Sequence, residues 1–280
     1  MKIFESIFLL NNFLSEIKIQ KKTIGFVPTM GALHNGHLSL LQKSKSENDF
    51  TLCSIFVNPK QFNNIEDLEK YPQNIEQDIS LLNKIDCDIL FCPSVEEMYP
   101  EPDNTIFDLG NLDVVMEGKF RPGHFNGVAL VVKKFFDIIQ PNKAYFGEKD
   151  FQQLRIIQHL VGFYNLPIKI IPVSIERESD GLAMSSRNIR LSLEERKIAP
   201  KIYQTLLKAK EMAINFRLSE VVNFVKTEIN TIEAFKIDYF EIVDTRTLLP
   251  IEDFSEKKNC IACIAVYLGN IRLIDNIILF

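Results

Sequence analysis

The sequence places two histidines three residues apart where a helix is expected to begin. The segment from Pro28 to His37 reads PTMGALHNGH and follows a short apolar stretch. A helix start offers unpaired backbone N–H groups and a positive dipole end, which together favour an anion. His34 and His37 share one face there, so both imidazoles can donate hydrogen bonds to a phosphate whose charge grows in a transition state. Gly31 and Gly36 would let the backbone approach that phosphate closely.

Two other interpretations of the histidine pair are a metal site and a purely structural turn. A metal site of the HxxH type needs a third ligand, and none lies nearby in the sequence. A solvated turn needs no ligand. The chain has four histidines and two of them fall in this one segment, so we favour the phosphate-binding interpretation.

A second polar segment, Gly147-Glu148-Lys149-Asp150, follows another apolar stretch and precedes a helical pattern. Lys149 offers a compact positive charge for a phosphate. Asp150 can accept hydrogen bonds from sugar hydroxyls, or it can simply cap the helix that follows. Alone, this segment is a weak signal, and its value depends on the other motifs.

A third polar segment, residues 181–188, reads GLAMSSRN. Ser185, Ser186 and Arg187 present two hydroxyls and a guanidinium in succession, which suits a polyphosphate. We interpret the segment as a mobile loop that closes over a triphosphate. The alternative is a polar linker, after which Ser192 caps the next helix.

Amide and imidazole side chains in two more loops are candidates for holding a small polar substrate. Asn58 and Gln61 lie in NPKQF, and Gln153 lies one helical turn beyond GEKD. Amides bind hydroxyls and carboxylates without adding charge, although a single amide is more often a surface residue. His124 lies in the glycine-rich segment GKFRPGHFNG, which either adds positive field to a crevice or forms a structural loop.

Strand-like and helix-like segments alternate through most of the chain, which predicts parallel strands joined by crossover helices. The expected strands are Ile24–Val27, Thr51–Val57, Asp88–Cys92, Ala144–Phe146 and Ile168–Val173, and the expected helices are Gly36–Glu47, Asn74–Asn83, Asn126–Ile139 and Asp150–Phe163. Near-continuous apolar strands indicate a sheet covered on both faces. The predicted fold class is therefore α/β, a Rossmann-like doubly wound parallel sheet. Ligands bind such sheets beyond the carboxyl ends of the strands, so we expect the polar loops to converge there.

The pattern changes near residue 176, where we expect a domain boundary. Residues 1–176 form the Rossmann-like domain, and residues 177–280 form a smaller α+β domain. The elements expected in the smaller domain are a helical stretch at Leu193–Ile214, a helix at Ser219–Ile232, and strands at Ile237–Val243, Ile261–Leu268 and Ile271–Leu279. Amphipathic Ile3–Ile17 is a packed helix or a partner surface, and we favour the packed helix.

Composition excludes several classes of protein. The 280 residues are 46% hydrophobic and carry a formal net charge of −5, which argues against a dedicated nucleic-acid binder because phosphate contacts need a basic face. We predict no secretory signal and no membrane span, since the apolar runs are too short. Five cysteines without a regular framework indicate reduced thiols in a cytoplasm. Cys260 and Cys263 fall on opposite faces of a strand, so we expect core cysteines rather than a metal or redox pair.

Taken together and in this order, the segments PTMGALHNGH, SIFVNPKQF, RPGHF, FGEKDFQQL and DGLAMSSRN resemble the pantothenate synthetase (pantoate–β-alanine ligase) family. The similarity runs from Gly25 through Arg196 and resumes in the tail at Tyr267–Gly269 and Arg272–Asn276. The resemblance implies an HxGH-type nucleotidyltransferase domain, a small C-terminal lid domain and a homodimer. It implies that pantoate and ATP give pantoyl adenylate and pyrophosphate with Mg²⁺, and that β-alanine then displaces AMP.

The resemblance also implies roles for individual residues, with His37 as the histidine usually named catalytic. The implied catalytic residues are His34, His37, Lys149, Ser185, Ser186 and Arg187. The implied ATP-binding residues are Met30, Gly31, Ala32, Leu33, His34, Asn35, Gly36, His37, Gly147, Glu148, Lys149, Asp150, Glu176, Met184, Ser185, Ser186 and Arg187. The implied binding residues for pantoate and β-alanine are Pro28, Thr29, Asn58, Gln61, His124 and Gln153.

The chain departs from the family pattern at a few positions. Glu176 stands where a small apolar residue usually touches adenine through its backbone, so its side chain must point away. Lys60 replaces a frequent methionine. Gln77-Asp78 carries one carboxylate where some relatives carry two, which leaves Asp78 as the implied neighbour of Mg²⁺ and the phosphates as the main ligands of the ion.

Three other functions compete with this interpretation. One is an HxGH enzyme that transfers AMP to a phosphate ester, which would have no amine-binding step. A tRNA synthetase is disfavoured by the acidic balance of the chain. The third is a nucleotide-binding sensor without turnover, against which the intact His34, His37 and Lys149 argue.

Overall fold

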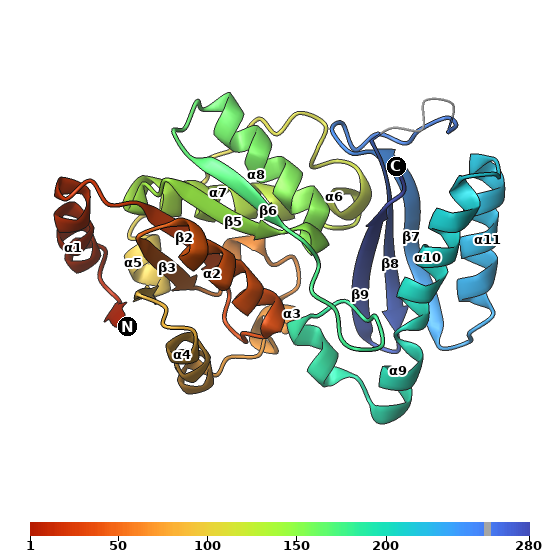
Figure 1. Cartoon of the computed structure of the whole chain (residues 1–280), viewed down its shortest axis with the longest axis horizontal. Coiled ribbons are helices and arrows are strands. Elements are labelled where there is room, and N and C mark those ends of the chain that lie inside the picture. The colour runs from red at the N-terminus through yellow and green to blue at the C-terminus, as the bar shows by residue number, and fades with distance from the viewer. Residues whose placement is uncertain (255–258) are drawn as a thin grey trace. The chain divides into compact units, whose positions relative to one another are not determined.

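The computed structural model describes residues 1–254 and 259–280, which fold into two compact units (Figure 1). The first unit comprises Met1–Glu148 and Gln153–Ser174, and the second comprises Lys149–Gln152 and Ile175–Phe280. The short segment Lys149–Gln152 therefore belongs with the later part of the chain, although it follows a strand of the first unit.

The first unit contains a six-stranded parallel sheet in the order β1-β4-β3-β2-β5-β6. The strands are β1 (Lys2–Phe4), β2 (Ile24–Thr29), β3 (Phe50–Ile55), β4 (Ile89–Phe91), β5 (Lys143–Gly147) and β6 (Lys169–Val173). The parallel sheet confirms the predicted fold class. From β2 the chain moves outward to β3 and β4 and later returns to the opposite side of β2 with β5. The order thus reverses between β2 and β5, where ligands of such sheets bind.

Helices cover the sheet of the first unit on both faces, as its apolar strands require. The helices from the start of the chain to residue 163 are α1 (Ile7–Ile19), α2 (Asn35–Glu47), α3 (Ile65–Glu69), α4 (Ile75–Lys84), α5 (Val95–Met98), α6 (Met116–Phe120), α7 (His124–Ile139) and α8 (Phe151–Phe163), with short 3₁₀ turns η1 (Pro59–Gln61) and η2 (Glu148–Asp150). Residues Lys149–Gln152, at the junction of η2 and α8, belong with the second unit. Phe26 of β2 packs on Phe135 and Phe136 of α7. Its neighbour Val27 lies in a core cluster with Leu41 of α2. This alternation follows from the two-residue period of a strand.

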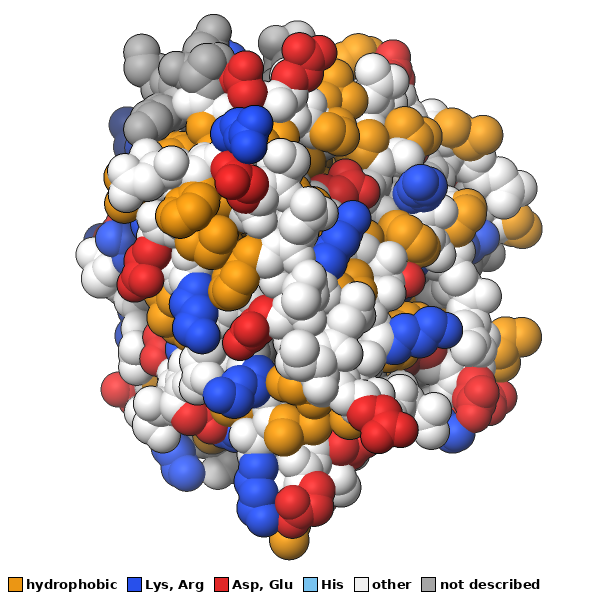
Figure 2. All heavy atoms as spheres, turned by 90° about the vertical axis from the view of Figure 1, so that its right-hand side faces the viewer, with side chains coloured by type: hydrophobic (Ala, Val, Ile, Leu, Met, Phe, Trp, Pro, Cys, Tyr) orange, Lys and Arg blue, Asp and Glu red, His pale blue; other side chains and the backbone are white. Residues whose placement is uncertain are grey.

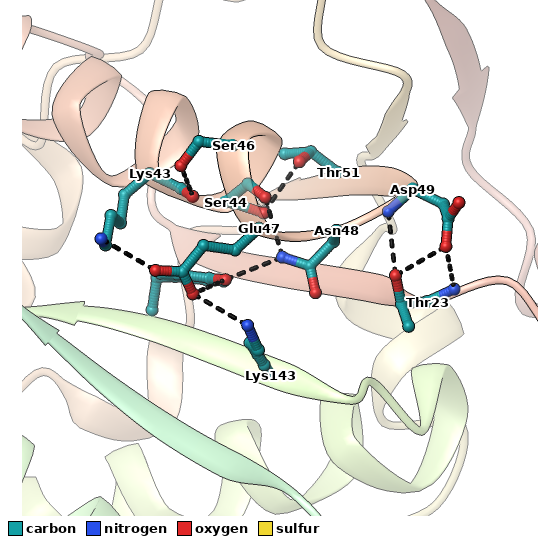
Figure 3. Close-up of polar contacts among 10 residues, drawn as sticks. Thr23, Lys43, Ser44, Ser46, Glu47, Asn48, Asp49, Thr51 and Lys143 are labelled. Carbon is teal, nitrogen blue, oxygen red and sulfur yellow. Dashed lines mark hydrogen bonds and ion pairs between the residues drawn. The ribbon is translucent and has the colours of Figure 1, made fainter.

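Polar contacts fix the carboxyl end of α2 to the sheet (Figure 3). Glu47 accepts from Lys143 at 3.0 Å and pairs with Lys43 at 2.8 Å. Hydrogen bonds from Lys43 and then Lys143 lower the pKa of Glu47 to about 2. Asn48 donates to the Tyr145 hydroxyl on β5 at 2.7 Å. These contacts hold the carboxyl end of α2 against β5.

Close packing of α2 on β2 requires a glycine at position 25. A Cβ added there would overlap the side chains of Ser44 and Asn48. Ser44 also shares a hydrogen bond of 2.8 Å with Thr51 of β3 (Figure 3). The helix therefore lies directly on the backbone of the strand that leads into the histidine segment.

The second unit contains an antiparallel sheet in the order β7-β8-β9. Its elements are β7 (Phe235–Asp244), β8 (Cys260–Leu268), β9 (Ile271–Ile278), the helices α9 (Leu193–Ile198), α10 (Lys201–Ala213) and α11 (Leu218–Asn230), and the 3₁₀ turn η3 (Ser186–Arg190). Leu206 of α10 and Val225 of α11 share a core with Ile264 of β8. Cys260 and Cys263 are buried in β8, as expected.

The outer face of α10 and α11 mixes charges of both signs with apolar patches (Figure 2). Lys208 of α10 and Glu228 of α11 face each other across this surface at 3.6 Å. Within the described ranges, no helix has both the length and the apolar content that a membrane span needs.

Two element predictions were wrong in detail. The single helical stretch at Leu193–Ile214 is two helices, α9 and α10, because Pro200 has no N–H and its ring opposes a continuing helix. The amphipathic stretch Ile3–Ile17 begins with the edge strand β1, which pairs with β4, and α1 starts only at Ile7. Strand β1 is three residues long, too short for its alternation to be recognised.

Candidate active site in the histidine turn

The histidine segment forms a tight turn between β2 and α2. Gly31 has φ +81° and Ala32 has φ +49°, so two successive residues are left-handed. This conformation costs an alanine about 1 kcal/mol. A Cβ at Gly31 would lie 2.9 Å from the Asp78 carboxylate, so the position requires glycine on both counts.

Asp78 of α4 holds this turn in place. Its Oδ2 accepts the N–H of Ala32 at 2.9 Å, and its Oδ1 accepts the N–H of Leu33 at 2.7 Å. The side chain is 2% exposed. Burial raises the pKa of Asp78, and the N–H donors of Leu33 and Ala32 oppose that rise. The carboxylate offsets the strain of the left-handed residues.

This role bears on the suggested contact between Asp78 and Mg²⁺. Both carboxylate oxygens already accept backbone N–H groups. The part of the chain that the structure describes contains no cluster of three His, Cys, Asp or Glu side chains suited to a metal. The geometry therefore assigns Asp78 to the turn, and its contact with a metal stays a prediction.

Replacing Asp78 with asparagine tests its role in the turn. The amide keeps the size of the side chain, but its NH₂ group would face one of the two backbone N–H donors. We expect the free energy of unfolding to fall by about 1–3 kcal/mol, the usual cost of leaving a buried donor unsatisfied. Urea unfolding measures this change. Glu76→Gln removes an exposed charge from the same turn of α4 and should be nearly neutral. Equal stability of the Asp78 and Glu76 variants would contradict the assignment.

His34 and His37 bind the backbone of the turn with one nitrogen each. His34 caps α2, and its Nδ1 accepts the N–H of Gly36 at 3.1 Å. The Nδ1 of His37 accepts the N–H of His34 at 3.3 Å. In a neutral imidazole an accepting Nδ1 leaves the proton on Nε2. The ring centroids lie 4.1 Å apart, which confirms that the two histidines share a face.

Two of the three amide candidates, Asn58 and Gln61, form a buried cluster in the first unit. Asn58 donates to the Gln61 Oε1 at 3.1 Å and to the Gly127 carbonyl at 3.0 Å. The Gln61 amide nitrogen donates to the Met30 sulfur at 3.0 Å, so the cluster reaches the histidine turn. His124 hydrogen-bonds the Gln61 carbonyl at 2.7 Å through its Nδ1. The structure therefore joins four candidates, Met30, Asn58, Gln61 and His124.

Glycine 127 permits the close approach of α7 to this cluster. A Cβ there would overlap the Lys60 carbonyl in η1. The Tyr99 hydroxyl supports Asn58 from a third segment by donating to its Oδ1 at 2.9 Å. Sequence reasoning did not identify Tyr99, because nothing in its local sequence indicates a contact with a residue so distant in the chain.

The remaining candidates of the first unit lie near the carboxyl ends of the strands. Pro28 and Thr29 end β2, and the Thr29 hydroxyl bridges the sheet and the turn by donating to Ser54 O at 2.7 Å and accepting the Gly31 N–H at 3.2 Å. Gly147 is the last residue of β5. Gln153 lies half-buried in the first turn of α8, and its part in substrate binding stays a prediction.

The candidates of the second unit lie in two segments. Lys149 and Asp150 belong to η2, directly before α8. In the other segment the Glu176 carbonyl accepts the N–H of Met184 at 3.0 Å, and the Glu176 side chain is exposed. Ser185 caps η3 by accepting the N–H of Arg187 at 3.3 Å.

Ser192 caps α9, as the alternative interpretation of the Ser-Ser-Arg segment had it. Ser192 accepts the N–H of Glu195 at 3.2 Å and its own N–H donates back to that side chain at 2.8 Å, which completes a capping box. This cap fixes the end of the Ser-Ser-Arg segment, and it is compatible with either interpretation of that segment.

The parallel sheet and the histidine turn at its switch point define a protein of the Rossmann-like α/β class. Residues 2–278 match the family model described as pantoate-beta-alanine ligase. A pantothenate synthetase of Porphyromonas gingivalis is 48% identical over 99% of both chains, and one of Bacteroides fragilis is 50% identical over 99% of this chain and 98% of its own. The chain therefore belongs to the pantoate–β-alanine ligase family.

Solved structures agree with this assignment. The crystal structure of the Thermus thermophilus pantothenate synthetase is 40% identical, covers all of both chains and has a TM-score of 0.93. The pantoate–β-alanine ligase of Francisella tularensis, crystallised with β-γ ATP and β-alanine, is 38% identical with a TM-score of 0.83, covering all of this chain and 98% of its own.

Proposed function

We propose that this chain condenses pantoate with β-alanine at the expense of ATP, through a pantoyl adenylate, and releases AMP and pyrophosphate. The observation that carries the proposal is the histidine turn at the switch point of the sheet. There, two imidazoles use Nδ1 to accept backbone N–H groups, which in a neutral ring places the proton on Nε2. Membership of the pantoate–β-alanine ligase family supports pantoate, β-alanine and ATP as the substrates.

Adenylation solves a chemical problem for the carboxylate of pantoate. A carboxylate is a poor acyl donor because its leaving group would be oxide. When it attacks the α-phosphorus of ATP, the new bond to phosphorus forms as the bond to pyrophosphate breaks. The acyl group then carries AMP as a leaving group. The β-alanine amine attacks the acyl carbon, loses a proton and expels AMP.

The protein has little covalent chemistry to perform, so positioning and charge stabilisation suffice. As the carboxylate attacks, negative charge builds on the α-phosphate and on pyrophosphate. His34 and His37 would donate Nε2 protons to the α-phosphate as hydrogen bonds, without abstracting a proton. Lys149, Ser185, Ser186 and Arg187 would bear the charge of the pyrophosphate.

The ATP site would extend from Met30 to His37 and include Gly147–Asp150, Glu176 and Met184–Arg187. Asn35 is exposed beside His34 in the first turn of α2. The buried amide cluster supports a pantoate site around Gln61, because its members are already held by hydrogen bonds and lose little freedom on binding. Gln61 would also neighbour β-alanine. Pro28, Thr29, Asn58, His124 and Gln153 would complete the substrate site.

Magnesium, quaternary structure and location complete the proposal. Mg²⁺ is usually bound by phosphate oxygens and by only one or two protein carboxylates. This fits a turn in which Asp78 binds backbone N–H groups. The bound Mg²⁺ would neutralise part of the phosphate charge. We propose a cytoplasmic homodimer with no nucleic-acid or membrane partner. Residues 1–176 would bind ATP and pantoate, and residues 177–280 would act as a lid.

A two-step assay tests the proposed reaction. ATP, Mg²⁺ and pantoate should give pyrophosphate in an amount matching the enzyme, and added β-alanine should release AMP and sustain turnover. An enzyme that transfers AMP to a phosphate ester would not respond to β-alanine. Tight ATP binding without any pyrophosphate would favour a sensor and contradict the proposal.

A further inference from the structure

A buried carboxylate on β9 pairs with an arginine at the base of the Ser-Ser-Arg loop. Asp275 is 5% exposed. Both its oxygens accept from the Arg177 guanidinium, at 2.7 and 2.9 Å. A two-point pair of this kind fixes the orientation of both side chains. Asp275 is thus committed to Arg177 and can act on a substrate only through other residues.

Arg177 in turn holds the loop that leads to Ser185. Its guanidinium donates to the Gly181 carbonyl at 3.0 Å and lies 3.6 Å from the ring centroid of Tyr203. Gly181 has φ +94°, and a Cβ there would lie 2.6 Å from the Tyr203 ring. The backbone of residues 176–184 closes as a hairpin through an isolated bridge between Arg177 and Ala183. The start of the loop is therefore fixed against α10.

The next residue of β9 reaches the other segment of the second unit. The Asn276 side chain donates to the Lys149 carbonyl at 3.0 Å, and the Asn276 N–H donates to Asp275 Oδ1 at 2.8 Å. Asn276 is 6% exposed. A continuous path of hydrogen bonds thus runs from Gly181 through Arg177, Asp275 and Asn276 to the backbone of Lys149.

From this path we propose that Asp275 and Asn276 are positioning residues, which keep Lys149 and the Ser-Ser-Arg segment in register for one phosphate chain. The proposal rests on the proposed function, because it assigns a task to those two segments. It gives two residues of the family-like tail, Asp275 and Asn276, a part in the reaction without any contact with substrate.

A double-mutant cycle with Lys149 separates positioning from simple stabilisation. Asn276→Ala removes the bond to the Lys149 carbonyl, and we expect it to slow pyrophosphate release from ATP and pantoate about 10- to 100-fold, since small misplacements of a charged group are costly. In a Lys149→Ala background, which lacks the ammonium to be positioned, the same change should have an effect of less than about two-fold. The proposal would be overturned if Asn276→Ala slowed pyrophosphate release by the same factor in both backgrounds, or if it had no effect on the parent protein.

Asp238→Asn is the matched control. It removes the negative charge from the ion pair in which Arg272 of β9 donates to Asp238 of β7 at 2.8 and 2.9 Å. This pair joins two strands of the same sheet, and we expect its loss to leave pyrophosphate release within about two-fold of the parent. A loss as large as that of Asn276→Ala would make the effect a general property of the sheet and overturn the proposal.

Amide hydrogen exchange gives a readout that needs no turnover. In Asn276→Ala, residues 147–152 should exchange faster while the core strand β8 stays protected. In Asp275→Asn, the amides of residues 181–188 should exchange faster while β8 stays protected. If Asp275→Asn does not fold, the exchange of Asn276→Ala alone tests the proposal. Unchanged exchange at residues 147–152 would overturn the proposal even if the parent protein is active. If the parent protein releases no pyrophosphate, the proposed function is contradicted. The exchange experiment then still tests whether Asp275 and Asn276 position Lys149 and the Ser-Ser-Arg segment.

Discussion

Replacing His37 with alanine is expected to slow pyrophosphate release from ATP and pantoate by about 10²–10³-fold while the protein stays folded. This decrease in rate is the usual effect of removing one pre-organised hydrogen-bond donor that stabilises negative charge in a transition state. The imidazole is oriented before substrate arrives, because its Nδ1 accepts the N–H of His34 at 3.3 Å. Rapid-quench measurement of pyrophosphate in a single turnover isolates this step from the later attack of β-alanine.

Two further variants separate a hydrogen-bond donor from a proton-abstracting base. The amide nitrogen of His37→Gln can reach the region that Nε2 occupies, so a donor role predicts partial recovery of the rate. A base role predicts no recovery, because an amide does not take up a proton. His159→Ala is the control, since His159 lies in α8 and binds the Asp108 carbonyl at 3.2 Å. Near-normal pyrophosphate release in His37→Ala would contradict the role of the turn.

Lysine 149 carries the second large expected effect. Lys149→Ala should slow adenylate formation by about 10²-fold, because the pyrophosphate leaving group would lose a fixed positive charge. The second half-reaction, started from supplied pantoyl adenylate, should be much less affected. Single-turnover rates with ATP and with the adenylate make this comparison directly.

Lys143→Ala provides a matched control at the other end of β5. Lys143 binds Glu47 at 3.0 Å, so its loss should lower stability slightly and leave the rate of adenylate formation unchanged. If Lys149→Ala melts earlier but turns over normally, the segment serves only to begin α8. In that case Lys149 would have no part in the chemistry.

Local sequence patterns predicted the parallel sheet well because its strands are short apolar runs with polar residues at their ends. Strand β1 was not predicted, because three residues are too few to show the alternation of a strand. Pro200 marks the break between α9 and α10 in the sequence, but helical periodicity continues on both sides of it and hides the break. Long apolar or periodic segments are thus predicted more readily than the points where they stop.

The shared face of the two histidines was also predictable, but the residues that hold the turn from a distance were not. His34, Gly36 and His37 form the turn through neighbours in the sequence. Asp78 reaches the same turn from 45 residues away, and Arg177 finds Asp275 at a separation of 98 residues. Contacts of this kind depend on how strands and helices pack, and no local spacing reveals them.

A crystal grown with ATP, Mg²⁺ and pantoate tests most directly whether imidazole, ammonium and hydroxyl groups act on one phosphate chain. We expect density for pantoyl adenylate, or for its substrates, with the Nε2 atoms of His34 and His37 at hydrogen-bonding distance from the α-phosphate and Lys149 on the departing phosphates. Nucleotide bound elsewhere, with both histidines facing solvent, would contradict the account.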